Sequence, residues 1–206
     1  MKERTELFSA QVFADLYKIK LSKKNQKPTT KYSLLLQLFM QRTLVLIRHA
    51  KSSWANPLQS DFERPLNDRG KEEAPAMGEK LKGQNIIPDL IISSSAKRTR
   101  QTAKRIAKEV GYDADNIKWE EKLYHCIPSV FEEVIHDIKD SVKTVFIIAH
   151  NPGITEFVNQ LSPQFRIDNM PTCGMVAAKT EEAHWNNFSS AKREVFLFEY
   201  PGSGKP

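Results

Sequence analysis

Two short apolar runs in the sequence lead into a histidine. TLVLI, residues 43–47, is followed by Arg48 and His49, and TVFIIA, residues 144–149, is followed by His150. A third run, DLIISS at 89–94, leads into KRTR, which contains Arg98. Burial penalises charged and polar groups that lack partners. A lone histidine is more often structural, but two histidines and two arginines after three such runs indicate a reactive site.

The order of the elements predicts how these side chains meet. From Thr43 onward, short apolar runs alternate with helical patterns, which is typical of an α/β fold with a mainly parallel sheet and helices on both faces. We expect one such domain over residues 41–206, because about 166 residues suit a single core. Open α/β sheets bind ligands at the carboxyl ends of their strands. The three runs therefore bring Arg48, His49, Arg98 and His150 to one edge.

Individual elements follow from local signals. A helix is expected from Asn67, a plausible cap, to Gly83, and Pro75 within it indicates a kink or a later start. Further helices are expected over 96–110, near 129–139 and after NPG at 151–153. The runs at 174–180 and 194–200 read as closing strands, and a short segment is expected around 117–119.

The residue types at the predicted edge suit phosphoryl chemistry. Lys97, Arg98 and Arg100 lie at a helix start, where cations are unfavourable unless an anion lies between them and the helix, although a solvated basic face is the common alternative. Arg48 and Arg98 could hold a tetrahedral dianion, and an unprotonated imidazole could attack its phosphorus. The sequence does not reveal the acceptor that would fix the tautomer of that imidazole. We expect no metal or cofactor, because no carboxylate pair or HExxH spacing occurs.

Four separated motifs carry a family resemblance: RHAKSSW, DFERPLNDRG, SSSAKRTRQTA and AHNPG. Together with LY at 123–124 and MPTCG at 170–174 they resemble the phosphoglycerate mutase-like histidine phosphatase superfamily, most closely its SixA-type phosphohistidine phosphatase branch. The resemblance spans residues 43–200. It implies that His49 is the nucleophile that becomes phosphorylated, that Arg48 and Arg98 clamp the phosphoryl group, and that His150 contacts it.

Other residues are assigned less directly. The resemblance implies that Arg64 is a basic group near the rim of the site, and a salt bridge with Asp61 or Glu63 is the alternative. Ser52 either donates to a phosphate oxygen or caps the turn. Trp54 is expected to pack over the loop, and His125 and His136, without motif support, are taken as structural or surface residues.

The resemblance also has a gap that bears on the substrate. The carboxylic acid that mutases and acid phosphatases use to protonate the leaving oxygen has no clear counterpart, although Glu120 and Glu121 lie in the corresponding region. A positioned acid commonly contributes about 10²–10⁴-fold to the rate. A phosphohistidine substrate, whose leaving imidazole is basic, tolerates that gap, and aryl phosphates do as well. The favoured function is a metal-independent phosphatase acting on phosphohistidine in a protein. A small-molecule phosphatase or mutase of the same superfamily, acting on small phosphate esters, and a non-catalytic module that binds phosphorylated partners are the alternatives.

Charge and composition limit the partners. Residues 1–39 carry 8 Lys/Arg and 3 Asp/Glu, whereas residues 40–206 carry 23 and 22, so the net charge of +6 belongs largely to the amino-terminal part. This distribution argues against nucleic acid as a partner of the domain. Residues 1–40 are expected to be a basic extension dispensable for chemistry. Two cysteines and the lack of a long apolar run favour a cytoplasmic protein without a membrane span.

Overall fold

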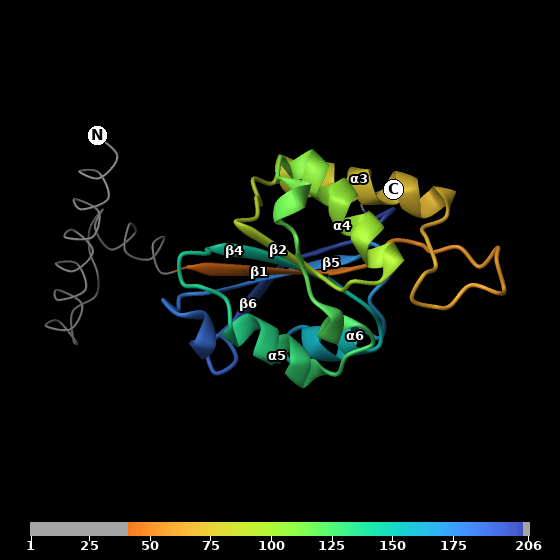
Figure 1. Ribbon diagram of the computed structural model, residues 1–206. Coiled ribbons are helices and arrows are strands. Elements are labelled where there is room, and N and C mark those ends of the chain that lie inside the picture. Colours follow the sequence, from red (N-terminus) through yellow and green to blue (C-terminus); the bar gives the residue numbers. More distant parts are fainter. Residues whose placement is uncertain (1–40, 204–206) are drawn as a thin grey trace, which may run out of the picture. The chain divides into compact units, whose positions relative to one another are not determined.

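The computed structural model describes residues 41–203, which form a six-stranded sheet with helices on both faces (Figure 1). The strands are β1 (Arg42–Arg48), β2 (Leu90–Ser93), β3 (Lys118–Trp119), β4 (Thr144–Ala149), β5 (Met175–Thr180) and β6 (Glu194–Glu199). The helices are α3 (Asp68–Gly83), α4 (Lys97–Val110), α5 (Pro128–His136) and α6 (Gly153–Val158), with short 3₁₀ turns η1 (Ala114–Asn116), η2 (Glu121–Leu123) and η3 (Trp185–Asn187).

The sheet has the strand order β3-β2-β4-β1-β5-β6. The four strands β3, β2, β4 and β1 pair in parallel, and β5 and β6 extend the sheet in antiparallel fashion. This arrangement confirms the predicted α/β class with a mainly parallel sheet. The three apolar runs of the sequence are neighbours in it, because β4 lies between β1 and β2.

Alternate residues of β1 face two separate cores. Leu44 and Leu46 pack in one apolar cluster with Phe131 of α5 and Phe157 of α6. Val45 and Ile47 pack in the other cluster, which holds the apolar side chains of α3 and α4. All four β1 side chains are fully buried. A strand covered on both faces must be apolar at consecutive positions, which explains the unbroken TLVLI run.

Helix α3 begins where the sequence predicts. The side chain of Asn67 accepts a hydrogen bond from the backbone N–H of Gly70 at 2.9 Å and caps the helix. A Cβ on Gly70 would lie 2.2 Å from the carbonyl oxygen of Lys51, so a glycine there lets the helix start close against the loop after β1. The helix is continuous from Asp68, and the later start that Pro75 suggested is therefore wrong.

The other helices agree with their predicted positions but differ in length. Helix α4 ends before Gly111, which adopts a left-handed conformation with φ of 75°. Helix α5 ends at His136, before the predicted 139, and α6 has only six residues. Within residues 41–203, no helix is both long enough and apolar enough to cross a bilayer. The predicted extension of residues 1–40 lies outside the described residues and stays a prediction.

Candidate active site

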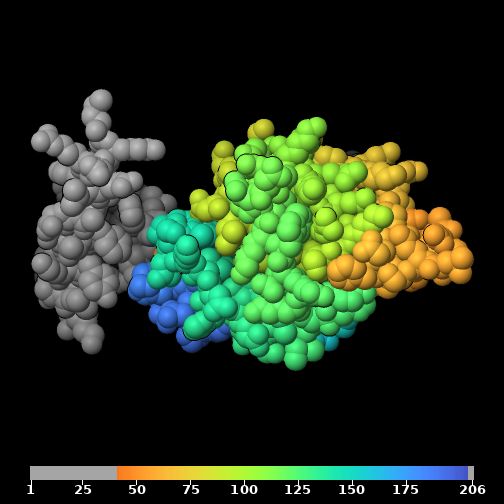
Figure 2. Space-filling model, in the orientation of Figure 1, coloured from red at the N-terminus to blue at the C-terminus, as the bar shows by residue number. Residues whose placement is uncertain are grey.

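The carboxyl ends of β1, β2 and β4 lie side by side. Arg48 of β1 is in register with Ala149 of β4, and Ser93 of β2 is in register with Ile148. The backbone N–H of His49 donates to the carbonyl oxygen of Ala149 at 3.1 Å. His49, Ser94 and His150 thus leave the sheet at one edge. The loop between β1 and α3, orange in Figure 2, projects from the molecule beyond this edge.

His49 has one ring nitrogen fixed by the backbone. Its Nδ1 lies 2.8 Å from the carbonyl oxygen of Ala50. A carbonyl can only accept, so Nδ1 carries the proton and Nε2 carries the lone pair. Nε2 accepts a hydrogen bond from Nε of Arg98 at 3.3 Å. The N–H of Ala50 donates to Oγ1 of Thr102 on α4, which holds this turn in place. The tautomer therefore leaves the lone pair of the ring on Nε2.

Burial keeps His49 in its neutral form. The ring is almost entirely enclosed, and this burial is the largest cause that lowers the pKa of His49 to about 3. The hydrogen bond to the Ala50 carbonyl opposes the shift, whereas the charges of Arg98, Arg48 and Arg64 add to it. A neutral imidazole with a free lone pair is the reactive form of this side chain.

His150 faces His49 across the site. The two ring centroids are 5.1 Å apart, and Nε2 of His150 is 2.9 Å from Oγ of Ser94. Burial, followed by the neighbouring His49 and Arg98, lowers the pKa of His150 to about 2. Among the described residues, Nδ1 of His150 is one of a few buried side-chain atoms without a hydrogen-bond partner. Buried polar atoms without partners are uncommon in proteins, and a bound ligand would supply one here.

Arg48 is held by the MPTCG segment. Its Nη1 donates to the carbonyl oxygen of Met170 at 2.6 Å, and Asn151 donates to the same oxygen at 3.2 Å. Nε of Arg48 is buried without a partner in the described part of the chain. Burial lowers the pKa of Arg48, and repulsion from Arg98 lowers it further. An anion between these two guanidinium groups would relieve that repulsion.

Arg98 comes from the first turn of α4 and is 3% exposed. Besides its bond to His49, it donates through Nη2 to Oδ2 of Asp61 at 2.8 Å and through Nη1 to the Asp61 carbonyl oxygen. Oδ2 of Asp61 also accepts from Oη of Tyr124 at 2.7 Å. Burial alone would raise the pKa of Asp61, but hydrogen bonds from Tyr124, Arg64 and Arg98 and the charge of Arg98 hold it well below its usual range. Asp61 therefore stays ionised and orients Arg98.

Arg64 and Ser52 contact each other rather than standing alone. Arg64 donates to Oγ of Ser52 at 2.8 Å, to the carbonyl oxygen of Ser53 at 3.0 Å and to Oδ1 of Asp61 at 2.7 Å. The predicted alternative of a salt bridge with Asp61 is thus present. The guanidinium carbon of Arg64 lies 3.1 Å from the ring centroid of Trp54, which is itself 76% exposed. Trp54 packs against the loop as expected.

The structure brings three further residues to the site that the sequence did not single out. Asp61 and Tyr124 orient Arg98, and His125, taken as structural or surface, has Nε2 3.3 Å from Nη2 of Arg98. What marks them in the sequence is their position, since all three fall within or next to the DFERPLNDRG and LY motifs. His136, in contrast, is exposed and pairs with its neighbour Asp137.

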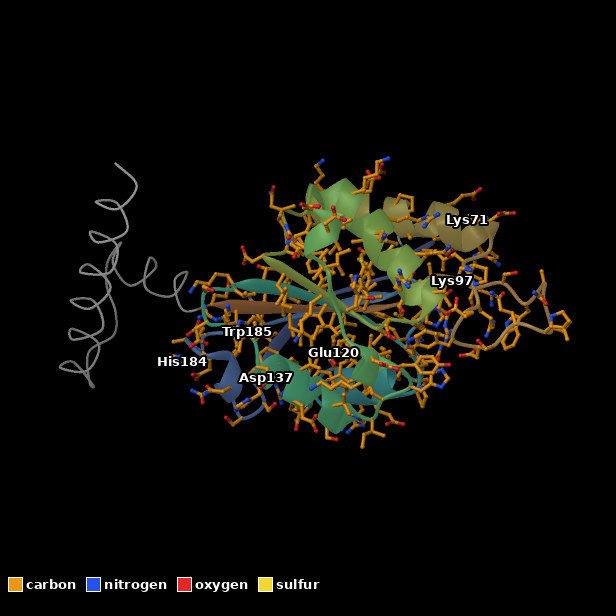
Figure 3. All side chains as sticks on the ribbon, in the orientation of Figure 1. Lys71, Lys97, Glu120, Asp137, His184 and Trp185 are labelled. Atoms are coloured by element: carbon orange, nitrogen blue, oxygen red, sulfur yellow. The ribbon has the colours of Figure 1, made fainter. Side chains whose placement is uncertain are left out.

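Two glutamates lie near the LY motif. The carboxylate of Glu120, labelled in Figure 3, is 3.4 Å from Nζ of Lys118, and Glu121 is exposed. In residues 41–203, no group of three or more His, Cys, Asp or Glu side chains converges in a way that could hold a metal ion.

The family of the chain follows from comparison with known proteins. The model for the histidine phosphatase superfamily (branch 1) matches residues 44–141. An uncharacterized protein of Mycobacterium tuberculosis is 34% identical over 164 residues, which cover 75% of this chain and 99% of that protein. The chain belongs to the histidine phosphatase superfamily.

Two further comparisons indicate which members of the superfamily the chain resembles. A SixA crystal structure from Agrobacterium tumefaciens superimposes with a TM-score of 0.65 at 26% identity, and the match covers 78% of this chain and 99% of that one. A 2,3-bisphosphoglycerate-dependent phosphoglycerate mutase of Bartonella tribocorum is 39% identical over 82 residues, only 38% of this chain and 40% of the mutase. The family assignment and the match to nearly the whole SixA chain support the conclusion that this protein is a phosphatase.

Proposed function

We propose that this phosphatase works through a phosphohistidine intermediate on His49 and that its substrate is phosphohistidine on another protein. The observation that carries the proposal is the fixed tautomer of His49. The Ala50 carbonyl holds the proton on Nδ1, and Nε2 presents its lone pair next to Arg98, at 3.3 Å. A module that only binds phosphate needs the arginines but does not need an imidazole prepared in this way.

The residues divide the work between binding and bond formation. Arg48, Arg98 and His150 surround the phosphoryl oxygens, and the lone pair on Nε2 of His49 forms a bond to phosphorus while the bond to the leaving atom breaks. Water then attacks the phosphorylated His49, the P–N bond breaks, and its electron pair returns to Nε2. Ser52 and Arg64 act at the rim, where the Ser52 hydroxyl accepts from Arg64 and keeps its own proton to donate to a phosphate oxygen. None of these steps calls for a metal or a cofactor.

The choice of substrate depends on the leaving group and on the relatives. The imidazole of phosphohistidine is a better leaving group than an alkoxide, which suits a sequence without a clear counterpart of the acid of mutases. The likeness to SixA spans almost the whole domain, whereas the mutase of Bartonella tribocorum matches over less than half of the chain. These observations favour phosphohistidine over small phosphate esters.

The test is rapid-quench trapping combined with a substrate panel. The protein is mixed with a phosphohistidine protein, an aryl phosphate and a sugar phosphate, and both the phosphoenzyme and kcat/KM are measured for each. We expect an acid-labile, base-stable phosphoenzyme on His49 and the highest kcat/KM for the phosphohistidine protein. His49→Ala should lower turnover on the order of 10⁴-fold or more while the thermal transition is kept. The matched control is His136→Ala, which removes an exposed histidine of α5.

Three results would contradict the proposal. Phosphate binding without any phosphoenzyme would favour the non-catalytic module. A sugar phosphate as the best substrate, or transfer of the phosphoryl group to a sugar hydroxyl, would favour a small-molecule phosphatase or mutase. Near-normal turnover by His49→Ala would remove the nucleophile from the mechanism.

A further inference from the structure

We propose that His125 is the proton donor to the leaving group in this enzyme, in place of the carboxylic acid that is missing. The inference rests on the proposed function, in which His49 is the nucleophile. It would speed the departure of the imidazole of phosphohistidine, which tolerates the lack of an acid, and would matter most for poorer leaving groups that need a proton. The contacts around Arg98 carry the proposal.

The guanidinium of Arg98 lies between two imidazoles. Its Nε is 3.3 Å from Nε2 of His49, and its Nη2 is 3.3 Å from Nε2 of His125. A phosphoryl group held by Arg98 would therefore lie near both imidazoles. Phosphoryl transfer places the attacking and leaving atoms roughly in line on opposite sides of phosphorus. The proposal assigns His49 to the attacking side and His125 to the side where the leaving atom departs.

The ring of His125 is held from several directions. It stacks on Tyr124 with centroids 4.3 Å apart and meets the ring of His150 at 5.5 Å in an edge-to-face arrangement. The backbone of His125 is left-handed, with φ of 49°, in the short segment between η2 and α5. This conformation is uncommon outside glycine, although histidine is among the residues that adopt it more often. Its side chain is 52% exposed, so a substrate can reach it.

The charges that face His125 suit a proton carrier. Oδ2 of Asp61 lies 3.4 Å and Nη2 of Arg98 lies 3.3 Å from Nε2 of His125, and His150 and Tyr124 are the other titratable groups in contact. Asp61 itself is held ionised and has no proton to give. Burial keeps His49 and His150 neutral. Imidazole can take up and release a proton near neutral pH.

The proton balances over the two steps. In the first step, the P–N bond to His49 forms and the bond to the leaving atom breaks. The leaving atom keeps the electron pair and takes a proton from the His125 imidazolium. In the second step, water gives its proton to neutral His125 as its oxygen bonds to phosphorus, and the P–N bond breaks. Phosphate leaves, and both histidines return to their initial states.

The test is the dependence of the rate on the leaving group. Wild type, His125→Ala and the control His136→Ala are assayed with aryl phosphates of graded leaving-group pKa and with one alkyl phosphate. For His125→Ala we expect a loss of about 10²-fold or more in kcat/KM for the poorest leaving group and only a few-fold loss for the best. Free imidazole in the buffer should restore part of the lost rate with poor leaving groups. The His136→Ala enzyme should match wild type throughout.

Several outcomes would overturn the inference. A uniform loss across the series would make His125 a positioning residue for Arg98, and no loss would make it a bystander. If His125→Ala fails to fold, His125→Gln serves as the second variant. Glutamine cannot act as an acid, so kcat/KM of His125→Gln should depend just as steeply on the pKa of the leaving group. Trapping keeps the two proposals apart: His125→Ala should still form phosphoenzyme on His49 with the best aryl substrate, whereas a wild type that forms none would refute the proposed function instead.

Discussion

The two ends of strand β1 each carry an arginine, Arg42 being buried and Arg48 partly buried, and their surroundings differ. Arg42, at the start of the strand, donates through Nη2 to the carbonyl oxygens of Asp140, at 2.8 Å, and Ala183. Burial lowers the pKa of Arg42, but the carboxylates of Asp140 and Asp89 counteract that shift. Asp140 also accepts from His184 at 2.6 Å. At this end, each positive or titratable group is matched with an acid.

At the carboxyl end, Asp61 pairs with Arg98 and Arg64, but no acid is among the charges that shift the pKa of Arg48. The charge that acts on Arg48 most strongly is another cation, Arg98, and the same guanidinium groups act on His49. Figure 3 shows the two ends apart, with His184 and Trp185 at one side of the molecule and Lys97, the first residue of α4, toward the other. Buried ions are normally paired in proteins. We infer that the residues around Arg42 stabilise the fold, whereas those around Arg48 bind an anion.

The largest effect should come from exchanging each arginine for methionine. Arg48→Met removes a donor to the transition state, so kcat/KM should fall by roughly 10²-fold, or about 3 kcal/mol. The thermal transition should stay the same or rise, because a repelled, desolvated cation is removed. Arg42→Met should instead lower the stability of the fold and leave kcat/KM unchanged. Its loss of donors to two carbonyl groups should cost about 1–3 kcal/mol of stability.

Measurement of both variants by steady-state kinetics and urea unfolding gives a crossed pattern. If Arg48→Met lost stability and kept its activity, or if Arg42→Met lost activity and kept its stability, the contrast between the two ends would be wrong. Phosphate or vanadate added to the protein should raise the unfolding midpoint of wild type and of Arg42→Met more than that of Arg48→Met.

Much of this contrast could be predicted from the sequence, because it depends on strand ends. The buried runs before Arg48 and His150 are continuous, and parallel strands bring their carboxyl ends together whatever the loops do. The cap at Asn67 and the stop at Gly111 are local and were also predictable. The opposite end of β1 was not, since Arg42 depends on Asp140 and Ala183, about 100 and 140 positions away.

The rest of the site depended on contacts that no local pattern encodes. The tautomer of His49 is set by a backbone carbonyl, that of Ala50, which any residue at that position would offer. Asp61 reaches Arg98 and Tyr124 only because the loop after β1 folds back over the first turn of α4. The place of His125 depends on a left-handed residue in an irregular segment. Such contacts arise from tertiary packing, and the sequence marks them only by their nearness to motifs.

The two ends should also respond differently to acid. Burial lowers the folded-state pKa values of His49 and His150 to about 3 and about 2, below the ordinary histidine pKa of 6.5, so below pH 6.5 the unfolded chain binds more protons at these residues. Stability contributed by the carboxyl end is therefore full above pH 6.5 and is lost as pH falls toward the folded values. The slope is at most about 1.4 kcal/mol per pH unit for each histidine. At the other end, Asp140 has a lowered pKa, so its contribution is lost only below the ordinary carboxylate range.

Urea unfolding at a series of pH values checks this order. Between about pH 6.5 and pH 4.5, the free energy of unfolding of His150→Gln should fall less steeply than that of wild type, by up to one proton's worth of slope. Asp140→Asn should keep the wild-type slope in that window and differ only at lower pH. An unchanged slope in His150→Gln would show that the histidine is not held neutral in the folded protein.

The smallest expected effect concerns Arg64, at the rim of the site. Arg64 binds Ser52, Ser53 and Asp61, so its role is either to anchor the loop after β1 or to contact substrate. Its contacts are of the paired kind seen at the Arg42 end, and an anchoring role predicts that Arg64→Ala lowers both the thermal transition and kcat/KM, the latter by roughly tenfold. The control is Lys71→Ala, which breaks an exposed pair with Asp68 at the start of α3 and should change neither. If Arg64→Ala instead raised KM with an unchanged thermal transition, Arg64 would belong with Arg48 and Arg98 as a group that binds the anion. The anion-binding arginines would then extend to the rim of the site.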